Sequence, residues 1–399
     1  MLLAKRSRGG SFLLWGACCA ALLGAGCSQS TTPSFRLNVM EVEAKQLEPP
    51  AAQKVADALV AMFGTPDEPF VFPESGLDLR KLQFAAGPVS SDARGSSHGL
   101  YRQHCAHCHG ITGDGLGPTA MFLNPYPRDY RTGEFKAKST LLNARPTQAD
   151  LDRLLKEGVP GTSMPSFVLL PQAEIDALVE YVKYLSMRGQ VERRLILELG
   201  NEESLELNRE LLIDTALADA AQAWADAEGA IIAPAAPPEV SLEESIALGR
   251  ELFQGSTANC VKCHGTLALG DGQTDDFDNW SKTTKTFFQD VRKVKPEEIA
   301  DLSLADFQDV GALPIRNIKP RNLRLGIFRF GRRPVDIYRR IHTGIAGTPM
   351  PGVGQSPENA AGLTPDQVWH LVNYVLRGLP YESLSEPPEQ FIAAERSVY

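Results

Sequence analysis

Four cysteines and two histidines form two copies of one short pattern in this chain of 399 residues. Residues 105–109 read C-A-H-C-H and residues 260–264 read C-V-K-C-H, so both fit C-x-x-C-H. Two thiols at this spacing can reach the two vinyl groups of one haem and form thioethers. The histidine that follows then lies beneath the porphyrin and offers an imidazole to the iron. The pattern therefore predicts two covalently attached haem c groups, held by Cys105 and Cys108 and by Cys260 and Cys263.

A second repeated string follows each cysteine pair and supplies a further candidate iron ligand. Residues 158–165 read G-V-P-G-T-S-M-P and residues 344–351 read G-I-A-G-T-P-M-P. A thioether fixed in a loop of Gly and Pro suits the sixth position of a haem iron, although methionine is more commonly an apolar gap-filler. His342 is an alternative to Met350 as sixth ligand. We predict that His109 and Met164 bind one iron, and that His264 and Met350 bind the other.

Other readings of the cysteine pairs are a zinc site, a redox dithiol or chance. The two pairs lie 155 residues apart, whereas zinc ribbons bring their C-x-x-C pairs much closer together. A redox dithiol needs no histidine after the second cysteine, and an exported dithiol tends to form a disulfide. Haem attachment explains the histidine in both copies, so we favour it.

The repetition extends beyond the cysteines and the methionines. Residues 127–135 and 320–328 share P-R-[DN]-x-R-x-G-x-F, and a helical apolar pattern follows each methionine, over 172–187 and over 364–377. The second of these helices opens with Thr364 and Pro365, a good N-cap followed by proline in the first turn. Repetition at this scale indicates two copies of one domain.

Each half resembles a class I cytochrome c on these motifs, over residues 95–190 and 245–380. The strings YRQHCAHCHGITGDGLGPTA and NPYPRDYRTGEFK also resemble haem-protein chains of planctomycete-type bacteria. The resemblance implies a mainly α fold, in which one helix leads into the cysteines and a later helix crosses it. It also supports His109, Met164, His264 and Met350 as ligands. The second half departs from the first by an insertion near 273–312, which we expect to loop out and either to dock a partner or to form plain surface.

The expected architecture is two tandem cytochrome c-like helical domains joined by a helical segment and a Pro-rich linker. Residues 190–230 are rich in Leu, Ala and Glu, and we expect their helix to pack between the domains. The expected parts are a signal peptide at 1–26, an N-terminal extension at 27–94, the first domain at 95–190, a connector with its linker at 191–244, the second domain at 245–380, and a tail at 381–399.

The N-terminus predicts export. Three bases precede an apolar run of 16 residues, and Cys27 follows it directly. The run is too short for a comfortable membrane-spanning helix, which needs about 20 residues. The small residues before Cys27 are similar to a bacterial lipobox, although Gly24 stands where Leu is usual. We expect a protein on the periplasmic side of a membrane, with Cys27 as a candidate lipid anchor and an uncleaved anchor or plain cleavage as alternatives.

Composition and charge limit the partners. The hydrophobic content of 43% and the charged content of 22% are ordinary for a soluble globular chain. The formal net charge of −9 disfavours nucleic-acid binding, which needs a basic face. Residues 316–340 nevertheless hold nine Lys or Arg and one Asp. This stretch is either a solvated face, with Arg321 and Arg324 near the haem propionates, or a docking surface for an acidic partner.

These observations favour electron transfer over catalysis. Two haems with both axial positions filled pass single electrons and do no bond chemistry. We therefore predict an exported di-haem cytochrome that carries electrons between unidentified respiratory redox partners. The alternatives are a haem-bearing subunit of a larger membrane-bound oxidoreductase and a di-haem peroxidase, which requires an open iron position.

Overall fold

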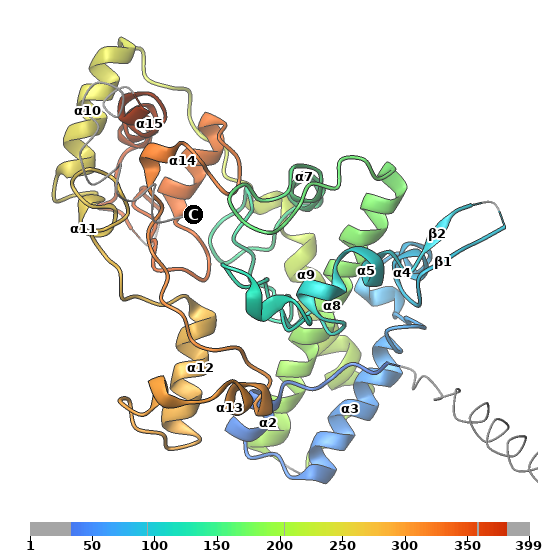
Figure 1. Cartoon of the computed structure of the whole chain (residues 1–399). Coiled ribbons are helices and arrows are strands. Elements are labelled where there is room, and N and C mark those ends of the chain that lie inside the picture. The colour runs from blue at the N-terminus through green and yellow to red at the C-terminus, as the bar shows by residue number, and fades with distance from the viewer. Residues whose placement is uncertain (1–32, 94, 203, 357–358, 381–399) are drawn as a thin grey trace, which may run out of the picture. The chain divides into compact units, whose positions relative to one another are not determined.

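The computed structural model describes residues 33–93, 95–202, 204–356 and 359–380 (Figure 1). The predicted signal segment, Cys27 and the tail at 381–399 lie outside these residues. Helices make up 49% of the structure and strands 5%, which confirms the mainly α fold class. Within the described ranges, no helix combines the length and the apolar character needed to cross a membrane.

Short helices precede the first cysteine pair. They and one small hairpin are α2 (Val39–Ala44), α3 (Pro49–Phe63), η1 (Pro73–Ser75), α4 (Leu79–Ala85), β1 (Ser90–Ser91) and β2 (Ser97–His98). The two strands pair antiparallel, with Ser90 opposite His98. Helices α3 and α4 pack on the long helix α8 (Gln172–Asn201), so this extension is built into the first half of the chain.

The first half places its helices around the first cysteine pair and the first methionine loop. Besides α8 they are α5 (Leu100–His104), α6 (Ala106–His109), η2 (Ala120–Phe122) and α7 (Gln148–Glu157). Thr147 caps α7, because its side chain accepts from Asp150 N while the Asp150 carboxylate accepts from Thr147 N. The predicted helix at 172–187 is confirmed, and α8 continues past it to Asn201 because buried apolar residues such as Val191 and Leu195 extend the pattern.

The helical connector packs its apolar side chains on the core of the first half. It consists of the π-helix η3 (Glu210–Leu217), α9 (Ala218–Ala225) and η4 (Glu228–Ala230). Trp224 meets Phe135 edge-on, with 5.7 Å between the ring centroids. Ile213 and Leu217 also belong to the apolar core of the first half. The connector has its own apolar stripe, and burying that stripe against the nearest core removes it from water.

The second half has a separate apolar core, which runs from Ile232 to Leu379. Its elements are α10 (Leu242–Gln254), α11 (Val261–His264), α12 (Asn279–Asp290), η5 (Ile299–Asp301), α13 (Leu304–Asp309), η6 (Leu323–Leu325), α14 (Pro334–Thr343), α15 (Pro365–Asn373) and the π-helix η7 (Tyr374–Gly378). The predicted start of α15 is confirmed, since Thr364 caps it and Pro365 stands in its first turn.

Helices α10 and α15 lie side by side in the second half (Figure 1). Gly249 marks their closest approach, because a Cβ atom there would lie 2.1 Å from the backbone oxygen of His370. The Ser245 hydroxyl lies 2.8 Å from His370 Nδ1, one turn away on the same face of α10. A glycine at the crossing lets the two backbones approach and so sets how this pair of helices meets.

The insertion at 273–312 is folded and has an apolar contact of its own. Phe287, Phe288 and Phe307 pack with Met40 of α2 in a third buried cluster. Arg292 adds a bidentate ion pair to Glu43, with both N–O distances at 2.8 Å. The insertion of the second half therefore packs against the N-terminal extension of the chain.

Candidate haem sites

The first C-x-x-C-H motif opens the short helix α6, which buries His109. The His109 Nδ1 atom lies 3.0 Å from the backbone oxygen of Arg128. A carbonyl oxygen can only accept, so Nδ1 carries the proton and the lone pair of Nε2 is left for a metal. Tyr130 stacks against the imidazole, with 4.7 Å between the centroids and 20° between the planes. The ring is thus fixed in orientation and tautomer, as metal-binding histidines require.

The second motif repeats this arrangement on α11. The His264 Nδ1 atom lies 3.1 Å from the backbone oxygen of Arg321. Arg321 holds the place in the second P-R-N string that Arg128 holds in the first P-R-D string. The partner of the ring differs, since Leu323 stands where the first half has Tyr130. The hydrogen bond that fixes the tautomer is therefore common to both halves. The parallel stack is found in the first, whereas Phe253 meets the His264 ring at 6.3 Å with a tilt of 47°.

Burial keeps both imidazoles neutral. It lowers the pKa of His109 to about 4, and it lowers the pKa of His264 as well. The bond to the Arg128 oxygen raises the pKa of His109, but burial is the larger effect. A neutral imidazole is the form that binds a metal ion. Both histidines thus have the protonation state that an axial ligand needs at neutral pH.

The four motif cysteines are free thiols in the structure. Burial raises the pKa of Cys105 to about 12 and that of Cys260 to about 11, so both stay protonated at neutral pH. Among the described residues, no three His, Cys, Asp or Glu side chains gather in a way that could hold a metal ion. Free thiols at this spacing fit the two vinyl groups of a haem.

The methionine loops have the same internal hydrogen bonds in both halves. In the first, Val159 N donates to Met164 O at 3.1 Å, and the Thr162 hydroxyl accepts from Met164 N at 3.2 Å. In the second, Ile345 N donates to Met350 O at 3.1 Å, and the Thr348 hydroxyl accepts from Met350 N at 3.2 Å. Each loop follows a helix, α7 or α14, that ends one residue before its first glycine.

Arg321 and Arg324, which we predicted to lie near the haem propionates, make different contacts. Arg324 donates from Nε to Leu267 O at 2.5 Å, and its buried Nη1 atom has no hydrogen-bond partner in the described protein. The buried Nε atom of Arg329 is also without one, and burial lowers the pKa of Arg329 to about 10. Unpaired buried donors are costly unless something accepts from them, so these atoms fit the carboxylates of a haem. Arg321 instead lies against the first half.

Much of the basic stretch at 316–340 makes contacts inside the molecule. Arg316 donates to Met121 O and Leu123 O in the first half, at 2.8 and 2.7 Å. Arg333 forms a bidentate pair with Asp336, and Arg340 donates to Gly331 O. These arginines join elements of this chain, which favours a structural role over docking of an acidic partner.

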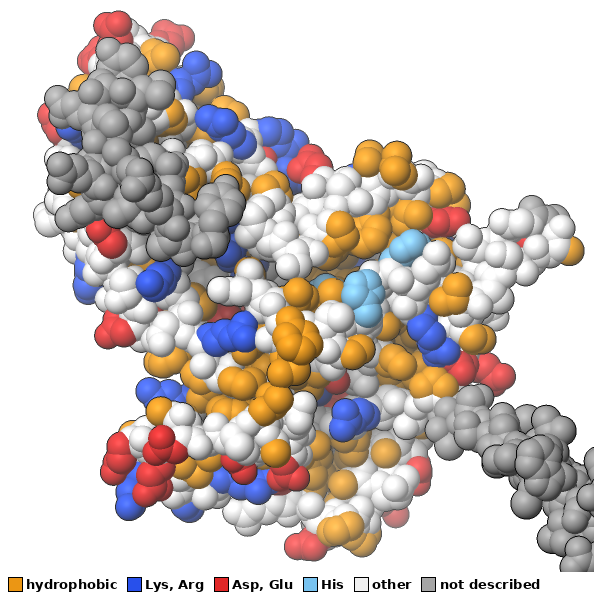
Figure 2. All heavy atoms as spheres, in the orientation of Figure 1, with side chains coloured by type: hydrophobic (Ala, Val, Ile, Leu, Met, Phe, Trp, Pro, Cys, Tyr) orange, Lys and Arg blue, Asp and Glu red, His pale blue; other side chains and the backbone are white. Residues whose placement is uncertain are grey.

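Exposed hydrophobic side chains follow the first methionine loop. Leu169 is 95% exposed and Val168 is 63% exposed, five and four residues after Met164. Phe122 of η2 is 77% exposed. Hydrophobic side chains also gather at several places on the face that Figure 2 shows. Two of these residues are thus neighbours in sequence of a predicted haem ligand.

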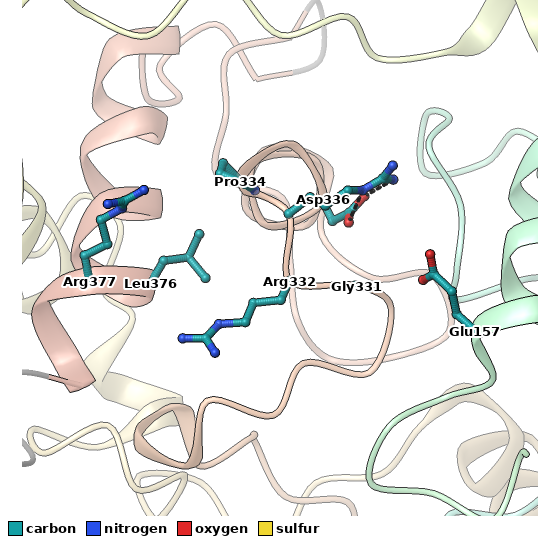
Figure 3. Close-up of a pocket in the computed structure, with 8 residues that line it drawn as sticks. Glu157, Gly331, Arg332, Pro334, Asp336, Leu376 and Arg377 are labelled. Carbon is teal, nitrogen blue, oxygen red and sulfur yellow. Dashed lines mark hydrogen bonds and ion pairs between the residues drawn. The ribbon is translucent and has the colours of Figure 1, made fainter. Parts of the chain in front are cut away.

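Eight residues of the chain line a cavity of about 540 Å³ (Figure 3). Asp336 of α14 lines it together with Glu157, which ends α7, and Arg332 and Arg377 also contribute to its wall. None of the predicted cysteine, histidine or methionine ligands lines this cavity. The predicted sites therefore do not include this cavity.

Sequence reasoning missed two features of the sites. It found the P-R-[DN]-x-R repeat but not that the arginine carbonyl fixes the histidine tautomer. It also did not foresee the stack of Tyr130 on His109. The repeat itself could have indicated the carbonyl contact. A string that both halves share, at a distance from the cysteines, suggests that it makes the same contact in both halves.

One family model matches the part of the chain that contains the first cysteine pair. Residues 96–186 match the family model of Cytochrome c. This match identifies that part of the chain as a cytochrome c domain, whose covalently bound haem c serves electron transfer.

The other comparisons add one structural likeness. The search of curated proteins found no match. Among solved structures, the chain is similar to a chain of the reducing HAO-like protein complex of Kuenenia stuttgartiensis, at 23% identity and a TM-score of 0.45. That alignment covers 70% of this chain and 94% of the other.

Proposed function

We propose that the chain is an exported di-haem c-type cytochrome that transfers single electrons between redox partners. The observation that carries the proposal is the agreement of the two halves. Each has a histidine whose Nδ1 is bonded to the carbonyl of the arginine in a P-R string, at 3.0 and 3.1 Å. Each also has a methionine held by the same threonine contact. The family match supports the first site, and this agreement extends the proposal to the second.

The residues have distinct parts in this function. Cys105 and Cys108 would hold one haem, and Cys260 and Cys263 the other. The haem supplies one-electron chemistry at its iron. The neutral imidazoles of His109 and His264 would each supply Nε2 as one iron ligand, and Met164 and Met350 would supply a soft thioether as the other. A thioether ligand raises the reduction potential, and a filled sixth position excludes bond chemistry.

A partner protein is part of the proposal. Leu169 and Val168 lie next to the Met164 loop and expose apolar surface there. Burying such surface in a transient contact stabilises an encounter without requiring a large interface. The same observation favours the second candidate, in which the chain is the haem-bearing subunit of a larger membrane-bound oxidoreductase. Co-purification with a catalytic subunit from the native membrane would select the second candidate.

Export and anchoring are also proposed. The basic residues and apolar run before Cys27 support a cleaved signal on the way to the periplasmic side. We propose that Cys27 becomes the lipidated first residue of the mature protein. Mass spectrometry of the mature N-terminus tests this, because a diacylglyceryl cysteine, a plain cleaved end and an intact signal differ in mass.

The decisive experiment is the haem content of the protein matured in a host that attaches haem c. We expect two haems per chain by the pyridine haemochrome assay, and one haem per chain in a Cys260→Ser/Cys263→Ser variant. One haem in the unaltered chain would refute the second site.

Addition of carbon monoxide to the reduced protein then distinguishes an electron carrier from a peroxidase. An unchanged spectrum means that both irons are six-coordinate, and a shift of one haem means an accessible iron.

A further inference from the structure

Arg128 touches both candidate haem sites. Its backbone oxygen accepts the hydrogen bond from His109 in the first half. Its guanidinium extends into the second half, where Nη2 lies 3.5 Å from the backbone oxygen of Ala346. Ala346 belongs to the loop that carries Met350. One residue thus joins the histidine of the first site to the methionine loop of the second.

Arg321 makes the same connection in the opposite direction. Its backbone oxygen accepts from His264, and its Nη2 atom lies 3.5 Å from the backbone oxygen of Pro160. Pro160 occupies the place in the Met164 loop that Ala346 occupies in the Met350 loop. The two arginines therefore form a reciprocal pair across the two halves.

A glycine in each loop makes room for the guanidinium of the other half. A Cβ atom on Gly161 would lie 2.9 Å from Arg321 Nη2, and one on Gly347 would lie 2.9 Å from Arg128 Nη2. Both glycines have a positive φ, +71° and +70°, which other residues adopt only with strain. The second glycine of the G-x-x-G-T-x-M-P loop thus has two functions. Its positive φ forms the turn of the loop, and its missing side chain leaves room for the arginine.

Both arginines are partly withdrawn from water. The Arg128 side chain is 20% exposed, its Nε atom has no hydrogen-bond partner in the described protein, and Glu134 lies 4.0 Å away. Arg321 is half-buried against the first half. Charges interact more strongly where water is excluded, because the effective dielectric constant is lower there. A positive charge held against the methionine loop of one site, on a residue whose backbone binds the histidine of the other, can therefore act on both.

We propose that Arg128 and Arg321 are positioning residues that couple the two haem sites. Each holds the methionine loop of the opposite half, and each makes the reduction potential of one site depend on the arrangement of the other. This inference rests on the proposed function, since it requires a haem in each half. It goes beyond that function by assigning a cross-half role to two residues of the repeated P-R string.

The test is a redox titration of the two-haem holoprotein followed by visible absorption. Met164→Leu and Met350→Leu variants first assign each one-electron wave to a half. Arg128→Gln is then expected to shift the Met350 wave, and Arg321→Gln to shift the Met164 wave. We expect at least a threefold change in the equilibrium constant for reduction, which corresponds to about 28 mV at 59 mV per tenfold for one electron. Arg128→Lys keeps the charge, so it should shift the potential less than Arg128→Gln does.

Arg316→Gln is the matched control, because Arg316 also bridges the halves but contacts neither methionine loop. Arg316→Gln should leave both reduction potentials unchanged. Equal shifts in Arg316→Gln and Arg128→Gln would mean that any loosened contact between the halves moves the potentials, and would overturn the coupling role. Unshifted potentials in folded, two-haem Arg128→Gln and Arg321→Gln proteins would overturn it as well. Fewer than two haems in the unaltered protein would refute the proposed function itself.

Discussion

Arg153 of α7 donates hydrogen bonds to both carboxylate oxygens of Asp336 of α14, at 3.0 and 3.1 Å. Each of these helices ends just before a methionine loop, so the pair ties together the two elements that present Met164 and Met350. Arg333 adds a second fork to the same carboxylate, at 2.8 and 2.9 Å. The carboxylate side chain is 3% exposed, which makes it the buried centre of a three-residue network.

Removing that carboxylate should destabilise the junction strongly. Breaking a buried ion pair from one side costs about 3–5 kcal/mol, because the remaining charge loses its partner. Arg153 is 22% exposed and can regain some water, so we expect Asp336→Ala to lower the free energy of unfolding by about 2–4 kcal/mol. Urea unfolding of the holoprotein measures the change. Asp152→Ala is the control, since its exposed pair with Lys156 should contribute about 0–1 kcal/mol. Equal losses in the two variants would contradict the network.

The same carboxylate predicts a dependence on acid. Burial raises the pKa of Asp336, but the hydrogen bonds from Arg333 and the charge of Arg153 outweigh it and leave the pKa below the ordinary value of 3.8. A carboxyl whose pKa is lower in the folded state stabilises the fold above its unfolded pKa. That stabilisation is lost as the pH falls through the folded value.

The unfolding free energy should therefore decline below about pH 4 and decline less steeply in Asp336→Asn, which cannot titrate. Unfolding in urea at a series of pH values between about 2 and 7 gives both slopes. Identical slopes in the two proteins would show that the acid dependence comes from other carboxylates.

Replacing either predicted methionine ligand should change its own iron and no other. Met164→Leu and Met350→Leu keep the side-chain volume and remove the thioether, so one iron should bind carbon monoxide and lose reduction potential in each variant. Absorption spectra with carbon monoxide and a redox titration report both effects. Met62→Leu is the control, because this methionine is buried in the core of the first half. A spectrum unchanged in both ligand variants would mean that the sixth ligands are other residues.

Gly249→Ala should weaken the crossing of α10 and α15. The new methyl group would lie 2.1 Å from His370 O, so the helices must separate. Overpacking of this kind costs about 1–3 kcal/mol, against about 1 kcal/mol that alanine gains over glycine in a helix. We expect a net loss in the unfolding free energy and faster amide exchange in α10 and α15. Gly229→Ala has open space around its Cβ and should leave both unchanged. A stability above that of the parent protein would show that α10 and α15 tolerate a wider crossing.

The haem chemistry could be predicted from the sequence because it depends on residues close together in the chain. The spacing of Cys105 and Cys108 and the histidine beside them fit haem attachment without reference to the rest of the molecule. The helices at 172–187 and after Thr364 were equally local, since an apolar period and a cap decide where a helix forms. Because this whole set of motifs occurs twice, the sequence also predicted that the chain has two similar halves.

The tertiary structure decided which distant segments meet. The connector at 210–225 packs on the core of the first half and the insertion packs on α2, and the sequence identified neither contact. The contacts of Arg128 with Ala346 and of Arg321 with Pro160 join residues 218 and 161 positions apart. Contacts of this kind depend on how side chains from separate elements fill the same space, and that packing leaves no periodic trace along the chain.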